Sequence, residues 1–313
     1  MTTRYHHYLL LHFTILVWGF TGVIGKFLEI SHLSSVEIVF WRTLIGWTTL
    51  LVYLIIIKQQ IQIGSKNILK LLGNGVLIGL HWYCFFEAII RANVSIALVF
   101  LSTTALFTSF VEPIITKKKF EPKELITSVL VVVGIVIIMN DLDIFSNHDY
   151  FIGIVYSLIS ALLAALFSVL NSVFVKSNHA GVISFYELLG GFVFISVLFL
   201  ISGDLFVNEL KLSIEQIVWL LILGTICTSF AFLMGVYVMR FIPAYTVNLS
   251  VNLEPIYAII LALLFFKDSE LMGMSFYLGA FIVVGSILLN ALFKNKKKPL
   301  DSGFNNELKQ VIY

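Results

Sequence analysis

Ten apolar stretches, most of them about as long as a membrane-crossing helix, occupy most of the sequence. A helix needs about 20 mainly apolar residues to span the hydrocarbon core of a bilayer. Only 12% of the 313 residues are charged, whereas soluble domains carry about 25%, so lipid must surround most of this chain. We therefore predict an all-α polytopic membrane protein with ten transmembrane helices. The predicted spans are 8–28, 36–57, 68–90, 93–116, 125–140, 151–174, 182–201, 214–238, 242–266 and 272–293.

Lysine and arginine residues gather on alternate sides of these spans. Cytoplasmic loops of membrane proteins are enriched in both residue types. With the N-terminus placed in the cytoplasm, 15 of the 20 basic residues lie in cytoplasmic loops and tails, four lie on the other side, and Arg42 lies within a span. The pattern predicts a multi-pass protein with both termini cytoplasmic.

The two halves of the sequence resemble each other. Residues 40–47 (FWRTLIGW) align with 185–192 (FYELLGGF), and 131–134 (VVVG) align with 282–285 (IVVG). Since each repeat has five helices, the second repeat must enter the membrane from the opposite side, as in secondary carriers with a midplane substrate site. The predicted units are a first repeat over 1–143, a second repeat over 150–293 and a basic cytoplasmic tail over 294–313.

Several short motifs resemble those of the EamA-like family in the drug/metabolite transporter (DMT) superfamily. The motifs are Trp18-Gly19, Phe40-Trp41-Arg42, His81-Trp82 followed by Glu87-Ala88-Ile89, the stretch from Leu101 to Phe107 before Glu112-Pro113, and Leu253-Glu254-Pro255. The resemblance implies ten helices in an inverted 5+5 repeat, a central cavity and a bacterial cytoplasmic (inner) membrane. It also implies a transported cargo, which in family members is an amino acid, another metabolite, a nucleotide sugar or a drug.

One position departs from the family pattern. Many members carry a proline in the fourth span where this chain has Thr104, whereas the counterpart Pro255 in the ninth span is present. Proline removes a backbone donor and disturbs a helix. We therefore expect a kink in the ninth span without a matching one in the fourth.

Arg42 and Glu187 occupy equivalent places in the two repeats. An ionisable group in mid-membrane costs at least about 2.5–3.5 kcal/mol, so it normally faces a cavity or a partner. Two interpretations follow. The residues line one cavity, where Arg42 binds a substrate carboxylate and Glu187 an amine, or they form a structural ion pair.

Other polar or aromatic residues within spans are further candidates. Glu254 stands just before Pro255 in the middle of the ninth span, and interrupted helices form the sites of many carriers. We consider Glu254 and Glu87 as proton-coupling carboxyl groups, with helix packing as the alternative. The remaining cavity candidates are Trp18, His81, Trp82, Asn171 and Asn252.

Small residues in the third span predict close helix packing. Gly75 and Gly79 are four residues apart, so they lie on one face of the helix. Small residues at this spacing let the backbones of membrane helices approach each other.

The motifs favour a carrier over an enzyme. The sequence has no His-Glu-x-x-His or Gly-x-Ser-x-Gly motif and no nucleotide-binding glycine loop. We expect a small-molecule substrate and the lipid bilayer as partners, no nucleic acid, no metal or other cofactor, and a monomer or homodimer. A cavity with Arg42 and Glu187 favours export of amino-acid-like compounds. The alternatives are a carrier of sugar or nucleotide-sugar derivatives and, in a different class, a membrane-embedded enzyme.

Overall fold

Helices make up every regular element in the part of the chain that the structure describes. That part of this computed structural model comprises residues 2–117, 119, 130, 131, 133, 134, 136–138, 148–202, 212–242, 247, 250, 251, 253–267 and 272–295. The helices are α1 (Thr2–Ile30), α2 (Ser35–Ile56), α3 (Ser65–Arg91), α4 (Val94–Leu101), α5 (Thr104–Thr116), α7 (His148–Phe174), α8 (Ala180–Ser202), α10 (Ile214–Ile222), η1 (Leu223–Phe230), α11 (Ala231–Val238), α13 (Glu254–Phe266) and α14 (Met274–Asn295).

Seven helical stretches are long and apolar enough to cross a membrane. They correspond to the first four predicted spans and to the sixth, seventh and eighth. The helices α13 and α14 contain shorter apolar stretches, Ile256–Phe266 and Met274–Ser286, in the ninth and tenth predicted spans. Much of the fifth span and of the first half of the ninth lies outside the described residues. The chain is therefore a multi-pass helical protein, and the count of ten helices stays a prediction.

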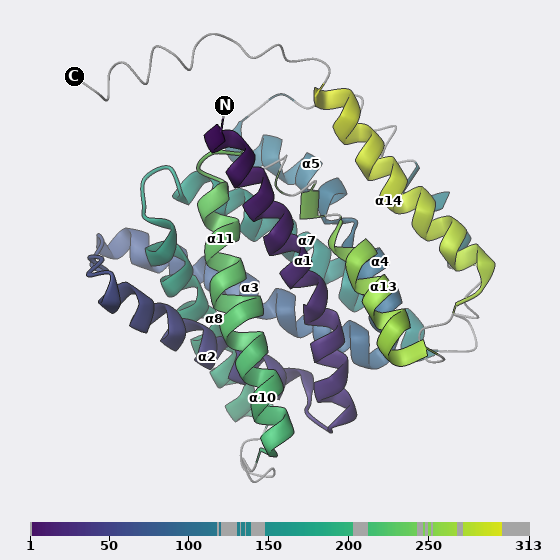
Figure 1. Ribbon diagram of the computed structural model, residues 1–313, viewed down its shortest axis with the longest axis horizontal. Coiled ribbons are helices and arrows are strands. Elements are labelled where there is room, and N and C mark those ends of the chain that lie inside the picture. The colour runs from purple at the N-terminus through teal and green to yellow at the C-terminus, as the bar shows by residue number, and fades with distance from the viewer. Residues whose placement is uncertain are drawn as a thin grey trace.

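The helices pack side by side into a bundle. Helix α1 runs between α11 and α13 across the face shown in Figure 1 and contacts both. Helix α3 packs against α7 and α8, and α8 also packs against α2. Elements of the two sequence halves therefore interleave through the bundle.

Glycine residues let α3 and α8 approach closely. A Cβ atom on Gly79 would stand 3.2 Å from the Cα of Gly191, and a Cβ atom on Gly75 would overlap the backbone of Glu187. Backbone contact of this kind needs small residues on both helices. The predicted packing role of Gly75 and Gly79 is confirmed.

Adding one methyl group at this crossing should destabilise the fold. In Gly75→Ala the new Cβ meets the backbone of Glu187, and overpacking typically costs about 1–3 kcal/mol. Gly73→Ala is the matched control, because nothing lies within 4 Å of its Cβ position. We expect a lower Tm for Gly75→Ala alone when both variants are unfolded by heat in the same detergent. Equal Tm values would contradict the tight crossing.

The fourth span is interrupted although it has no proline at that place. Helix α4 ends at Leu101 and α5 begins at Thr104. The hydroxyl groups of residues 102–104 each donate to the carbonyl oxygen three residues earlier, at 2.6–2.7 Å, and such bonds compete with regular helix bonding. Helix α13 also begins in the middle of its span, at Glu254. Both spans therefore contain a break between helical segments, and the expectation of a kink in the ninth span alone stays a prediction.

Candidate functional site

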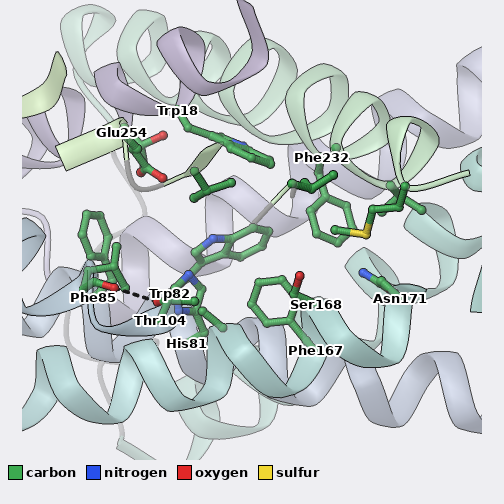
Figure 2. A pocket seen from close by; sticks show the side chains of 18 of the residues that line it. Trp18, His81, Trp82, Phe85, Thr104, Phe167, Ser168, Asn171, Phe232 and Glu254 are labelled. Carbon is green, nitrogen blue, oxygen red and sulfur yellow. Dashed lines mark hydrogen bonds between the residues drawn. The ribbon is translucent and has the colours of Figure 1, made fainter. Parts of the chain in front are cut away.

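A cavity lies in the middle of the bundle, bordered by α1, α2, α3, the α4–α5 interruption, α7, α11 and the start of α13. The space between its walls is about 960 Å³ when the part open to the outside is included. Aromatic side chains form much of its wall (Figure 2), namely Trp18, Trp82, Phe85, Phe167 and Phe232. The ionisable side chains among its described lining residues are Arg42, His81 and Glu254. The cavity is thus an apolar chamber with three ionisable groups.

Arg42 is buried, with 1% of its surface exposed, yet part of its guanidinium group has no partner. Its Nε donates to Thr228 Oγ1 at 2.7 Å. Its Cζ lies 3.9 Å from the centre of the Trp82 ring, a cation–π contact. Its Nη1 is buried without a hydrogen-bond partner. A buried unpaired donor on a cation is costly, so this geometry suits an anionic ligand that accepts from Nη1.

A π-helical segment presents Thr228 to Arg42. In η1, Thr228 Oγ1 donates to the carbonyl oxygen of Leu223, five residues earlier, and accepts from Arg42. The next residue, Ser229, donates to the carbonyl oxygen of Gly46 on α2 at 2.8 Å. Short π-helical segments are frequent at functional sites. Here these hydrogen bonds attach the π-helical segment η1 to α2 beside the guanidinium group of Arg42.

Glu254 is the second charged group of the cavity. It is the first residue of α13, and Figure 2 shows it near Trp18, on the opposite side of the Trp82 ring from Phe167. It interacts electrostatically with Arg42, but the two side chains are not among the ion pairs of the described residues. A gap therefore remains between the two charges.

The structure also places Trp18, His81, Trp82 and Asn171 in the cavity wall. His81 Nδ1 lies 2.9 Å from the carbonyl oxygen of Ser160, and Ser160 Oγ donates to the carbonyl oxygen of His81 at 3.0 Å. This reciprocal pair ties α3 to α7 and fixes the imidazole ring. Trp18 packs over Gly235, where a Cβ atom would stand 2.7 Å from its ring.

Glu187 does not line the cavity, and it does not meet Arg42. Its two carboxyl oxygens accept from Asn74 Nδ2 at 2.7 Å and from Asn171 Nδ2 at 3.1 Å. No ion pair joins Arg42 and Glu187 in the part of the chain that is described. Neither a shared cavity nor a structural ion pair is therefore formed by these two residues.

The opposite directions of α2 and α8 explain this separation. Arg42 is the eighth residue of α2, and Glu187 is the eighth residue of α8. The two helices are antiparallel, since Phe40 packs against Phe199 while Trp47 packs against Phe185. Equal positions counted from the starts of antiparallel helices lie on opposite sides of the midplane. The symmetry that makes the two residues equivalent also holds them apart.

Two further candidates from the sequence lie away from the cavity or outside the described residues. Glu87 stands near the end of α3 and pairs with Arg91 at 3.4 Å, and Arg91 also pairs with Asp149 at 3.3 Å. This partly exposed cluster joins α3 to α7 and does not line the cavity. Asn252 lies outside the described residues.

Sequence reasoning did not identify Thr228 or Asn74. Thr228 was one of several hydroxyl residues in an apolar span, and such residues commonly bond to their own helix. Asn74 lies between Gly73 and Gly75. A signal was present there, because an amide within a predicted span needs a buried polar partner.

Known proteins share both the sequence pattern and the fold. The sequence profile of the EamA-like transporter family matches residues 7–140 and 151–292. An uncharacterised transporter of Archaeoglobus fulgidus is 25% identical over 298 residues, covering 92% of this chain and 98% of that protein. The pseudopaline exporter CntI of Pseudomonas aeruginosa is 27% identical over 194 residues, covering 62% of this chain and 64% of the exporter. One crystal structure, with 13% identity, superposes with a TM-score of 0.67 over 93% of this chain and 98% of that chain. The chain therefore is a multi-pass membrane transporter of small molecules and belongs to the EamA-like transporter family.

Proposed function

We propose that the protein is a secondary carrier that exports amino-acid-like metabolites by alternating access, with Arg42 binding the substrate carboxylate. The observation that supports this proposal most directly is the unpartnered Nη1 of Arg42 beside the cavity. Guanidinium groups suit carboxylates because they can donate two parallel hydrogen bonds. The similarity to transporters, one of them named as an exporter, favours a carrier over a membrane-embedded enzyme.

The second charge favours a substrate that also carries an amine. Glu254 lines the same cavity and interacts with Arg42 across a gap. A zwitterion would place its carboxylate at Arg42 and its amine at Glu254. Proton coupling by Glu254 is the alternative to this binding role. A phosphorylated sugar derivative would need more positive charge than Arg42 and His81 supply among the described lining residues.

The positions of the lining residues support alternating access. Asn171 and Met239 line the cavity near the C-terminal ends of α7 and α11. Just beyond α11, Phe241 stacks on His7 of α1 with ring centres 4.0 Å apart. The cavity thus reaches from the middle of the bundle toward the N-terminal end of α1. With both termini in the cytoplasm of a bacterial cell, as we propose, this end faces the cytoplasm.

Aromatic rings cluster at the opposite end of the bundle. Phe27 of α1 stacks on Trp219 of α10 with ring centres 4.9 Å apart, and Phe266 of α13 lies at the same distance from Phe27. An exporter loaded from the cytoplasm would have to separate this cluster to release its cargo. Two repeats that exchange conformations provide such a movement.

A stabilisation screen of the purified protein tests the carboxylate assignment. The probes are amino acids, their methyl esters, and the matching carboxylic acids without the amine. A ligand at 100 times its Kd stabilises a protein by about 2.7 kcal/mol, so binding carboxylates should raise Tm. The methyl esters should leave Tm unchanged, and Arg42→Ala should remove the shifts. Equal shifts with acids and esters would refute the role of Arg42.

A further inference from the structure

Glu187 is a fully buried carboxyl group without a counter-ion. None of its surface is exposed, and its carboxyl oxygens accept from the neutral amides of Asn74 and Asn171. The ion pairs in the described part of the chain do not include it. An isolated buried carboxylate is so costly that such groups are usually neutralised.

The neighbouring helices bring no charge to Glu187. The side chains that face Glu187 are Asn74 on α3 and Asn171 on α7. Arg42 on α2 is turned toward Trp82 and Thr228. Other ionisable groups on α3, α8 and α11 are directed elsewhere: Lys70 is exposed, His81 bonds to Ser160, Tyr186 donates to the carbonyl oxygen of Ile61, and Tyr237 packs against His7 and Phe241.

The cluster around Glu187 has more acceptors than donors. Asn74 Nδ2 donates to three acceptors, which are a carboxyl oxygen of Glu187, Asn171 Oδ1 and the carbonyl oxygen of Phe167. Asn74 Oδ1 is itself buried without any partner. A buried acceptor without a donor costs free energy. The cluster therefore lacks one hydrogen-bond donor.

We propose that Glu187, Asn74 and Asn171 form a proton-binding site that controls contact between the two repeats. The carboxylate takes up one proton from the cavity and becomes a neutral carboxylic acid, and it releases the same proton later in the cycle. The new hydroxyl group supplies the hydrogen-bond donor that the cluster lacks.

Two features link this proton to transport. Asn171 lines the cavity and also bonds to Glu187, so it connects the site to the substrate chamber. The bond of Asn74 to Glu187 crosses from the first repeat to the second, beside the Gly75 crossing of α3 and α8. A hydrogen bond to a charged group is roughly twice as strong as a neutral one. Protonation therefore weakens a contact that has to loosen when the repeats move.

Infrared spectroscopy of the full chain in liposomes tests the proton site. The pH is changed in steps, and the C=O stretching band of protonated carboxyl groups is measured at each step. We expect a titrating band of one carboxyl group that is lost in Glu187→Gln and retained in Glu254→Gln. Asn74→Ala should move the midpoint of this band, because the amide donates to the ionised form. A wild-type band that is unchanged in Glu187→Gln would overturn the proposal.

Two controls keep the test decisive. If Glu187→Gln does not fold, Glu187→Asp keeps a carboxyl group at a new place, so its band must shift, and an unshifted band would refute the site. A midpoint that changes when K⁺ is replaced by Na⁺ at constant ionic strength would overturn the choice of a proton as ligand. Only the link to transport rests on the proposed function, since the titration needs no substrate. If Glu187→Gln loses the band but still transports, the link between the proton site and transport is refuted.

Discussion

Replacing Arg42 with Ala is expected to abolish transport while the protein still inserts and folds. The variant removes the guanidinium group whose Nη1 has no partner in the protein. Hydrogen bonds to charged groups contribute about 1.5–3 kcal/mol, which corresponds to a loss of about 10–150-fold in affinity. Proteoliposomes loaded with a carboxylate from the stabilisation screen measure the effect as the initial rate of efflux.

Two further variants separate the charge of Arg42 from its position. Arg42→Lys keeps the charge but loses the planar group that donates to Thr228 and stacks on Trp82, so we expect a partial loss. Thr228→Val keeps Arg42 intact and removes one hydrogen bond that orients it, so we expect a smaller loss than with Arg42→Ala. Normal efflux by Arg42→Ala, at wild-type yield and gel-filtration profile, would exclude Arg42 from the site.

Several parts of this architecture could be predicted from local sequence signals. Long apolar stretches indicate spans without knowledge of packing, and Gly75 with Gly79 indicates a close crossing, because both signals depend on one helix alone. Arg42, Glu254 and Asn171 were found because a polar group within a span must face a cavity or a partner.

The partners of these groups depend on several helices at once and could not be predicted in the same way. Equivalence between Arg42 and Glu187 was visible in the sequence, but their depth follows from the opposite directions of α2 and α8. Thr228 reaches Arg42 through a π-helical segment, which shifts hydroxyl groups away from the positions of a regular helix. Pairwise contacts across an inverted repeat thus need the helix directions as well as the alignment.

Replacing Glu254 with Gln is expected to change the selectivity for ligands. Glutamine has the shape of glutamate without its charge, so the contact with a substrate amine is weakened while the contact of Arg42 with a carboxylate remains. For an amino acid, losing the charged contact should reduce affinity by about 1.5–3 kcal/mol, or about 10–150-fold. The matching carboxylic acid without the amine should bind about as well as it does to the wild type. Measuring Tm at increasing concentrations of each ligand gives the two affinities.

The double variant Arg42→Ala/Glu254→Gln tests whether the two charges act as a pair. Removing Arg42 alone leaves Glu254 beside the cavity without the cation that interacts with it, and an uncompensated charge is more destabilising than the loss of both charges. We therefore expect a higher Tm for the double variant than for Arg42→Ala. Since a double-mutant cycle isolates the coupling between two sites, additive changes in stability would show that the charges act independently. If Glu254→Gln lowers the affinity for the amino acid and for the matching carboxylic acid equally, the proposed amine contact is refuted, because only the amino acid carries an amine.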